Sequence, residues 1–314
     1  MNNKPSSHSP VKIAVCGTGS MGSNHARILS SLPGVHLAGV LDADAKRAAE
    51  VAERYSCRVL DGNNPFAGVD GVVVAVPTCY HVETVAPLLK AGIGVLCEKP
   101  MAATPRECDV INEAAAETGA PLLVGHVEHF NPGVEAIASR IEKPGFMEVH
   151  RLGVFSPRSL DVDVVLDLMI HDIEIVLSLV ASPLESVEAV GVSVLSDWVD
   201  IANARLTFAD GCVANLTASR ISREKVRKLR VFQSRAYLAV DYAEQAVEHY
   251  ELRVGAEGRS IVKVPTAVQK EEPLRNELKH FADVLLRNAT PRVDGKTARK
   301  AVAVANRILQ CMKR

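Results

Sequence analysis

The sequence predicts an α/β protein of two domains: a doubly wound parallel sheet, followed by an α+β domain with a mostly antiparallel sheet. Near-continuous Val, Ile and Leu strands alternate with helical segments over about the first 125 residues. Repeated strands with period-2 hydrophobicity then run from about residue 184 to residue 264. The length of 314 residues also favours two packed domains over one.

In the first domain, apolar strands without polar alternation indicate a parallel sheet that helices cover on both faces. The expected strands are residues 12–16, 35–41, 58–60, 71–76, 93–97 and 121–124. The expected helices are residues 20–31, 43–55, 81–91 and 104–118.

The pattern changes after about Gly125, which predicts domains at 1–125 and 126–314. Strands joined by turns such as Ala209-Asp210-Gly211 indicate an antiparallel sheet. The expected strands are residues 145–154, 187–194, 201–208, 212–219, 228–233, 236–242, 249–253 and 261–264. The expected helices are residues 164–180, 274–286 and 295–312.

Composition excludes several classes of protein. A net charge of −1 gives no electrostatic case for binding nucleic acid or an anionic membrane. No apolar stretch reaches the roughly 18 to 20 residues that a membrane helix needs, and residues 1–10 read as a disordered leader rather than a signal peptide. The seven cysteines are scattered without a CxxC pair, so we expect buried thiols and a cytoplasmic protein.

Residues 17–22 fit G-x-G-x-x-G, between an apolar strand and a helix. In that context the glycines permit a tight turn, a close approach to a pyrophosphate and close helix packing, with the diphosphate on the helix N-terminus. Asp42 ends the second strand, where a carboxylate binds the adenine ribose and repels a 2′-phosphate. NAD is therefore favoured over NADP, although Lys46 and Arg47 leave room for both.

Polar residues end two further strands of the predicted parallel sheet, at the edge where ligands bind. Val76-Pro77-Thr78 ends one, with His81 just beyond, either as a cofactor contact or as an exposed histidine at a helix start. Glu98-Lys99-Pro100 ends the next. Lys99 is a candidate to hold a substrate hydroxyl, because burial and neighbouring charge can move a lysine pKa toward neutrality. The candidate cofactor contacts are Gly17, Gly19, Ser20, Met21, Gly22, Asp42, Val76, Pro77, Thr78, His81, Glu98 and Lys99.

The expected helix 164–180 is apolar almost all round and is predicted to be buried. Its polar residues form one stripe: Asp167, His171, Glu174 and Ser178. Buried polar groups need partners, so Asp167 could orient His171 as a general base or simply satisfy it in the core. Asp172 lies off the stripe and could cap or brace the site.

Two other polar segments are candidates for ligand contact. Residues 125–132 leave the parallel sheet and include His126, Glu128, His129 and Asn131. They favour a hinge or substrate loop, because a metal site there lacks a defined geometry and a fourth ligand. The basic run 220–228 reads as a solvated loop that would hold phosphates if it faced a cleft.

Taken together, the segments at 17–22, 76–81, 98–100 and 167–172 resemble the Gfo/Idh/MocA family over nearly the whole chain. The resemblance implies a Rossmann domain and a second domain with a large open sheet that often makes dimer or tetramer contacts. It implies NAD(P)-dependent oxidation or reduction at a sugar or cyclitol carbon. It also implies that Lys99, Asp167 and His171 are the catalytic residues.

Residues 124–132 resemble a subgroup that includes UDP-N-acetylglucosamine 3-dehydrogenases, except that His129 stands where that subgroup usually has arginine. Ser156-Pro157-Arg158 and Arg220 also resemble it. The candidate substrate contacts are Lys99, His126, Glu128, Asn131, Arg158, His171 and Arg220.

The resulting hypothesis is hydride transfer between a sugar carbinol, such as C3 of a UDP-linked amino sugar, and nicotinamide, in a homodimer or homotetramer. The alternatives are an inositol or free-sugar dehydrogenase, an NAD-dependent glycoside hydrolase, and a non-catalytic NAD-binding regulator. Retention of Lys99, Asp167 and His171 argues against the regulator, since a sensor has no need of an acid–base set.

Overall fold

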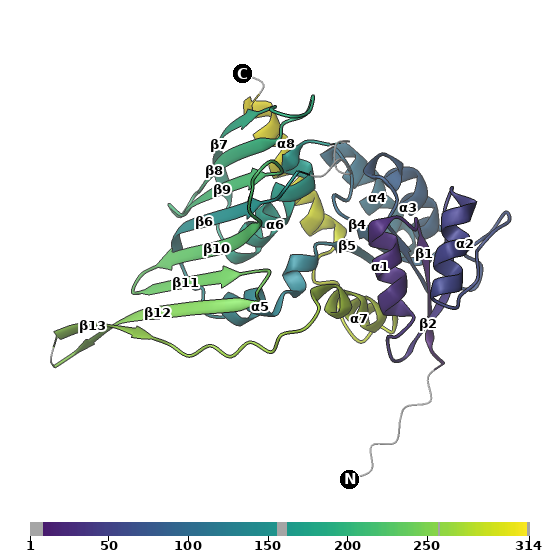
Figure 1. The fold of residues 1–314 in the computed structure, drawn as a ribbon, viewed down its shortest axis with the longest axis horizontal. Helices are drawn as coiled ribbons and strands as arrows, with labels where there is room; N and C mark the ends of the chain where they lie inside the picture. The colour runs from purple at the N-terminus through teal and green to yellow at the C-terminus, as the bar shows by residue number, and fades with distance from the viewer. Residues whose placement is uncertain (1–8, 156–161, 257, 313–314) are drawn as a thin grey trace, which may run out of the picture. The chain divides into compact units, whose positions relative to one another are not determined.

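The computed structural model describes residues 9–155, 162–256 and 258–312, which form two compact units (Figure 1). The first unit consists of Met1–Ala102, Arg106–Gly125 and Leu274–Gly295. The second consists of Ala103–Pro105, His126–Pro273 and Lys296–Arg314. The chain leaves the first unit after Gly125, where the domain boundary was predicted. Residues 274–295 then return to the first unit, so the two units are not divided at a single point in the sequence.

The first unit is built on a five-stranded parallel sheet in the order β2-β1-β3-β4-β5. Its strands are β1 Val11–Cys16, β2 Val35–Leu41, β3 Gly71–Val74, β4 Gly94–Glu98 and β5 Leu122–Gly125. Every residue of β3, β4 and β5 is buried, as the continuous apolar runs predict for strands covered on both faces.

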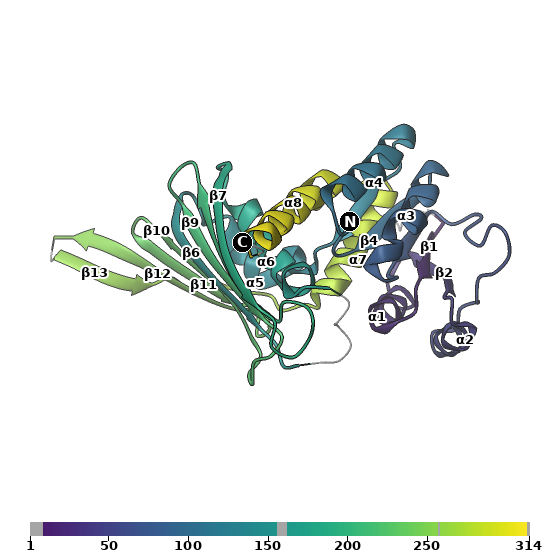
Figure 2. The same ribbon diagram turned by 90° about the horizontal axis from the view of Figure 1, so that it is seen from above.

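Helices connect consecutive parallel strands, and such crossover connections place helices on the faces of the sheet. The helices are α1 Ser20–Leu29, α2 Ala45–Arg54, α3 His81–Lys90, α4 Pro105–Thr118 and α7 Pro273–Leu285, with a 3₁₀ turn η1 at Thr78–Tyr80. Figure 2 shows α1 and α2 on one side of the sheet and α3 and α4 on the other. The doubly wound domain is therefore confirmed.

Three predicted boundaries in this unit were wrong. The expected strand 58–60 is a single bridge from Val59 to Val40 beside β2. The strand expected over 71–76 ends at Val74, before Pro77. Helix α2 begins at Ala45 rather than residue 43, because the Asp44 side chain accepts hydrogen bonds from the backbone N–H groups of Lys46 and Arg47 and so caps the helix.

The second unit is built on an eight-stranded sheet in the order β13-β12-β11-β10-β6-β9-β8-β7. Only the β6–β9 pair in it is parallel. The strands are β6 Pro144–Leu152, β7 Leu184–Val192, β8 Ile201–Phe208, β9 Val213–Ser219, β10 Val226–Gln233, β11 Ala236–Asp241, β12 Ala246–Gly255 and β13 Gly258–Lys263. This arrangement confirms the mostly antiparallel sheet.

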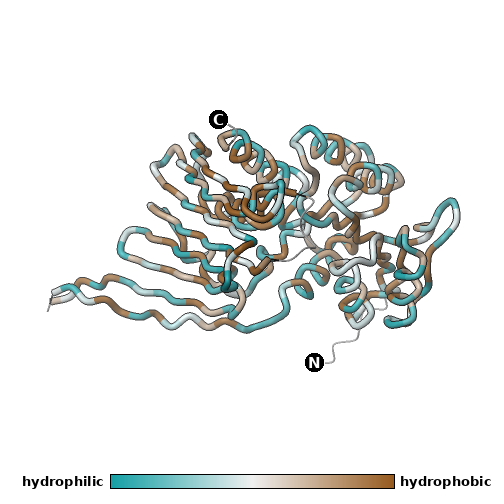
Figure 3. Tube along the Cα trace, turned by 45° about the horizontal axis from the view of Figure 1, so that its top comes forward, coloured by the Kyte–Doolittle hydropathy of each residue, from teal (hydrophilic) through white to brown (hydrophobic). Residues whose placement is uncertain are grey.

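One face of this sheet is packed and the other is not. Buried and more exposed residues alternate along β8 and β9, and Figure 3 shows the matching alternation of hydropathy. Figure 2 shows α5 Pro132–Ala138, α6 Ile170–Leu179 and α8 Gly295–Met312 on one face. The core of the second unit lies between these helices and that face.

The predicted helix 164–180 contains an irregular first turn. Val165–Met169 forms a π-helical turn, η3, and α6 follows directly from Ile170. Such turns alter the angular spacing of side chains and are frequent at functional sites. The residues of the polar stripe differ in exposure: Ser178 is exposed, Glu174 is buried, and Asp167 and His171 are partly exposed.

The cysteines are free, and Cys16 and Cys97 are buried in strands as expected. Over the part of the chain that the structure describes, none of the helices combines the length and the apolar character that a bilayer crossing requires.

Candidate functional site

The glycine-rich turn of the first unit has the geometry of a phosphate cradle. Gly17 has a φ of +89°, and a Cβ at Gly22 would lie 1.8 Å from the Gly17 carbonyl oxygen, so both positions exclude a side chain. A Cβ at Gly19, the N-cap of α1, would meet no atom within 4 Å. The space over Gly19 and the N–H groups of α1 therefore fit the diphosphate of a dinucleotide.

Asp42 is held against this turn. Its Oδ2 accepts hydrogen bonds from the backbone N–H of Thr18 at 2.6 Å and the Thr18 hydroxyl at 2.8 Å. Partial burial favours the neutral acid, but the hydrogen bonds from Asp44 and Thr18 and the charge of Arg47 keep the pKa of Asp42 below its ordinary value. Asp42 is therefore an anion at neutral pH and stands where the ribose hydroxyls of NAD would need an acceptor.

The next strand ends are tied together by His81, which is buried. Its Nε2 lies 3.0 Å from the Val76 carbonyl oxygen, and its Nδ1 lies 3.0 Å from that of Pro100. The exposed alternative for His81 is therefore wrong, because the side chain links the segment after β3 to the segment after β4. Pro77 and Thr78 lie in the chain between Val76 and His81, which this contact holds together. Contact of Pro77 and Thr78 with the cofactor remains a prediction.

A buried acidic cluster supports Lys99 at the end of β4. Glu98 Oε1 lies 2.7 Å from His25 Nε2, and Glu98 Oε2 accepts the backbone N–H of Lys99 at 3.1 Å. Burial opposes ionisation of Glu98, but the hydrogen bond and charge of His25, together with Lys99, lower its pKa. Glu98 thus braces the backbone of Lys99.

Glu277 of α7 completes this cluster and is only 1% exposed. Among the residues that the structure describes, neither of its carboxyl oxygens has a hydrogen-bond partner. Burial, reinforced by the charge of Glu98, raises the pKa of Glu277 well above its ordinary value. The two neighbouring carboxyl groups therefore have pKa values shifted in opposite directions, that of Glu98 down and that of Glu277 up.

In the second unit, Asp172 braces the helix that carries His171. Arg151 of β6 donates to both carboxylate oxygens of Asp172 at 2.9 Å and to Glu128 Oε1 at 3.0 Å. Its guanidinium carbon also lies 5.3 Å from the centre of the Tyr242 ring. This ion pair is consistent with the bracing role predicted for Asp172, and its partner Arg151 was not indicated by the sequence.

The segment after β5 supplies structural contacts as well as candidate ligands. Asn131 caps α5 by accepting the Gly133 N–H, and it donates to Glu128 and to the Tyr242 carbonyl oxygen. Glu128 accepts a hydrogen bond from Arg151, so it belongs to a buried ion-pair network. Contact of Asn131 and Glu128 with substrate remains a prediction.

Histidines of this segment face α6. The His126 and His171 rings meet edge to face with centres 6.1 Å apart, and His126 is buried. His129 Nδ1 lies 3.3 Å from Glu174 Oε1. The histidine that replaces the subgroup's usual arginine therefore faces a buried carboxylate. His126 and His171 lie together, as a shared site requires.

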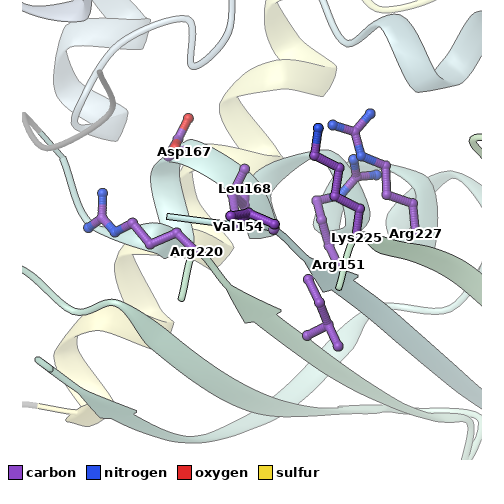
Figure 4. A pocket seen from close by; sticks show the side chains of 9 residues that line it. Arg151, Val154, Asp167, Leu168, Arg220, Lys225 and Arg227 are labelled. Carbon is purple, nitrogen blue, oxygen red and sulfur yellow. The ribbon is translucent and has the colours of Figure 1, made fainter. Parts of the chain in front are cut away.

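A cavity of about 190 Å³ opens between η3 and the ends of β6, β9 and β10 (Figure 4). It is lined by Arg151, Leu152, Gly153, Val154, Asp167, Leu168, Arg220, Lys225 and Arg227. Arg220 is buried and donates to Asp200 Oδ1 at 3.0 Å and to the carbonyl oxygens of Val162 and Val199. Arg158 lies outside the described residues. The basic run 220–228 is therefore not a solvated loop throughout, because Arg220 is buried and its end forms β10.

Sequence reasoning missed His25, Arg151 and Glu277. Glu277 carried a signal, because it falls between Leu274 and Leu278 on the apolar face of an amphipathic helix. His25 lies three residues after Gly22, on the buried face of α1. Arg151 carried none, because its partners come from distant parts of the chain.

Comparison with known proteins matches both units. Residues 11–126 match a family model described as an oxidoreductase family with an NAD-binding Rossmann fold, and residues 147–239 match the GFO/IDH/MocA C-terminal domain. The chain is 33% identical over 303 residues to a UDP-N-acetylglucosamine 3-dehydrogenase of Acidithiobacillus ferrooxidans, covering 94% of this chain and 95% of that protein. A solved structure of a protein of that name and organism has a TM-score of 0.89, at 33% identity, covering 96% of this chain and 97% of that one.

The names of more distant relatives contain other substrates. An inositol 2-dehydrogenase of Saccharopolyspora erythraea is 36% identical over 179 residues, 52% of each protein. A levoglucosan dehydrogenase in complex with NADH and levoglucosan has a TM-score of 0.86 over 97% of both chains, but at 17% identity it shows the fold alone. From the full-length similarity across both units, the chain belongs to the Gfo/Idh/MocA family of NAD-binding oxidoreductases.

Proposed function

We propose that this protein transfers hydride between nicotinamide and a carbinol of a nucleotide-linked sugar, C3 of a UDP-N-acetylamino sugar in particular. The observation that carries the proposal is the full-length similarity to a UDP-N-acetylglucosamine 3-dehydrogenase, which spans both units. Asp167 supports it, since this predicted acid–base residue lines a cavity together with four cationic side chains.

Oxidation of a carbinol to a carbonyl releases a hydride from carbon and a proton from oxygen. When bound, the nicotinamide ring supplies the acceptor for that hydride. The residues of this chain handle the proton: His171 takes it as general base, and Asp167 stabilises the imidazolium. Lys99 donates a hydrogen bond to the same oxygen and stabilises its developing charge. Reduction of the carbonyl uses the same groups in reverse.

The cofactor that the first unit would hold is NAD in preference to NADP. The Gly17–Gly22 turn and the α1 N-terminus would receive the diphosphate, and Asp42 would accept from the adenine ribose. Arg47 is a cation that could bind the 2′-phosphate of NADP, but its guanidinium lies 3.2 Å from Asp44 and 3.9 Å from Asp42. Both carboxylates would repel a 2′-phosphate placed beside Arg47.

We also propose that the protein is a homodimer or homotetramer that uses the large sheet. Large apolar side chains stand exposed on its strands, among them Val190, Val192, Phe232, Val254 and Ile261. Sedimentation at several protein concentrations tests this, and a monomer at micromolar concentration would contradict it.

The function is tested by incubating the purified protein with NAD and a panel of UDP-sugars, free sugars and inositols, and following NADH absorbance. We expect a response confined to UDP-sugars. A response to inositol or free sugars alone would identify the other dehydrogenase classes. Hydrolysis of a glycoside while bound NAD stays oxidised would identify the hydrolase, and no turnover of any kind would favour the regulator.

A Lys99→Ala variant tests the role of the lysine. Removal of a group that handles the reacting oxygen should lower kcat by roughly 10²-fold or more. Lys90→Ala is the matched control, because Lys90 is an exposed lysine at the end of α3 that pairs with Glu117. Near-normal turnover by Lys99→Ala would refute the assignment.

A further inference from the structure

Two arginines lie directly opposite each other on the packed face of the large sheet. In the antiparallel register of β10 with β6, Arg227 is paired with Arg151. Like charges directly opposite on neighbouring strands are destabilising, so such a pair needs anions nearby. Glu128 and Asp172 supply two, but both hydrogen-bond to Arg151, at 2.9 to 3.0 Å.

The positive charge of Arg227 is only weakly neutralised by these carboxylates. Its guanidinium reaches no closer than 4.0 Å to Glu128 Oε1, beyond hydrogen-bond distance, and its side chain is 52% exposed. Most of its fork of N–H donors therefore faces the cavity and solvent. This fork is the geometry that binds phosphate oxygens in pairs.

Lys225 adds a second cation to the same place. It lies two residues before Arg227 and therefore on the same face of the chain, and both line the cavity. Figure 4 shows the two side chains pointing the same way. Gly153, which has no side chain to fill the space, lines the same cavity. Glu128 and Asp172 both pair with Arg151, so among the described residues Lys225 and Arg227 are the cations of this cavity whose side chains are not held in such an ion pair.

The same cavity contains Asp167, the predicted partner of the general base. In a nucleotide-linked sugar the diphosphate is attached at C1, which is two carbon–carbon bonds from C3. A diphosphate held by Lys225 and Arg227 would therefore keep the C3 hydroxyl within a few bonds of the cavity that Asp167 lines. A free sugar or an inositol has no group that would use these cations.

We propose that Lys225 and Arg227 bind the diphosphate of the nucleotide sugar and so select nucleotide-linked substrates over free sugars. The inference rests on the proposed function and names the residues that give it its substrate class. These two residues act on binding rather than on chemistry. Their removal should raise KM and leave kcat nearly unchanged.

The test is the double variant Lys225→Gln/Arg227→Gln beside Lys225→Gln alone. Lys228→Gln is the matched control, since Lys228 belongs to the same basic run but pairs with Asp241 at 3.7 Å and lines a different pocket. UDP binding is measured by calorimetry, and KM and kcat are measured with UDP-N-acetylglucosamine and NAD. Circular dichroism shows whether each variant is folded. Lys225 has no ion pair with any other described residue, so its single variant should fold normally.

We expect each substitution to weaken UDP binding about 10-fold, and the pair roughly 100-fold, as for hydrogen bonds between charged groups. Lys228→Gln should bind UDP like the wild type. If the wild type oxidises the UDP-sugar and the double variant keeps its KM and its UDP affinity, the inference is overturned while the proposed function stands. If the wild type oxidises a free sugar or inositol and binds no UDP, both are overturned.

Discussion

Replacing Arg151 by methionine should destabilise the second unit severely, because it isolates two buried carboxylates. Arg151 is 4% exposed, and its partners Asp172 and Glu128 are 2% and 8% exposed. Methionine keeps much of the volume of the side chain but removes all three charge-assisted hydrogen bonds. Asp172 and Glu128 would then have to remain charged without their main partner or take up protons.

The expected loss is about 3 to 5 kcal/mol in the free energy of unfolding at pH 7, the cost of removing one partner from a buried ion pair. It should depend on pH. Burial already raises the pKa of Asp172 while Arg151 opposes that rise. Without Arg151 the pKa rises further above its unfolded value, so the penalty grows as pH rises from 5 to 8 and shrinks as pH falls.

The assay is urea denaturation followed by the fluorescence of Trp198, the only tryptophan of the chain, which lies in the second unit. Arg230→Met is the control, because Arg230 of β10 pairs with Glu148 of β6, the strand that carries Arg151, at 2.7 Å but is 42% exposed. That pair should be worth at most about 1 kcal/mol. Equal losses in the two variants, or a loss for Arg151→Met that does not change with pH, would refute the reasoning.

Two further variants probe the first unit. Glu277→Gln should become more stable relative to the wild type as pH rises, by up to about 1.4 kcal/mol for each pH unit between the unfolded and the folded pKa of Glu277, because a carboxyl whose folded pKa is raised loses stability in that direction; a constant difference in Tm between pH 5 and pH 8 would contradict this. Gly22→Ala should abolish NAD binding or folding, since its Cβ would lie 1.8 Å from the Gly17 carbonyl oxygen, and calorimetry that detects normal NAD affinity would disprove it. Gly19→Ala should fold normally but bind NAD at least about 10-fold more weakly, because its methyl group meets only the space left for the diphosphate; unchanged affinity would show that the diphosphate does not approach this turn.

Local signals in the sequence predicted most elements of both units in order, although helix α5 at Pro132–Ala138 was not predicted. Continuous apolar runs identified β3 and β4, and alternation identified β8 and β9, because burial on two faces or on one leaves those patterns. The short run at 58–60 does not form a strand, because the backbone groups of Arg58 and Leu60 both bond to Val40 and the pairing stops at that single bridge. The π-helical turn at Val165–Met169 has no signature in hydrophobic periodicity.

Some residues of the candidate site could also be predicted from local signals in the sequence. Asp42 and Lys99 follow buried strands and Glu98 ends one, so position alone singled them out. Asp172 looked like a bracing residue, but its partner Arg151 lies on a strand 21 residues away, and no local pattern indicates that pairing. Glu277 could not be linked to Glu98 before α7 was known to pack with the first unit.

The central claim is that hydride leaves C3 of a UDP-linked amino sugar. It is tested most directly with UDP-N-acetylglucosamine deuterated at C3, incubated with the protein and NAD, followed by mass measurement of the reduced cofactor. We expect reduced cofactor heavier by one mass unit, formed roughly 10²-fold or more slowly by Lys99→Ala. Unlabelled reduced cofactor, or no reduction with any UDP-sugar, would contradict it.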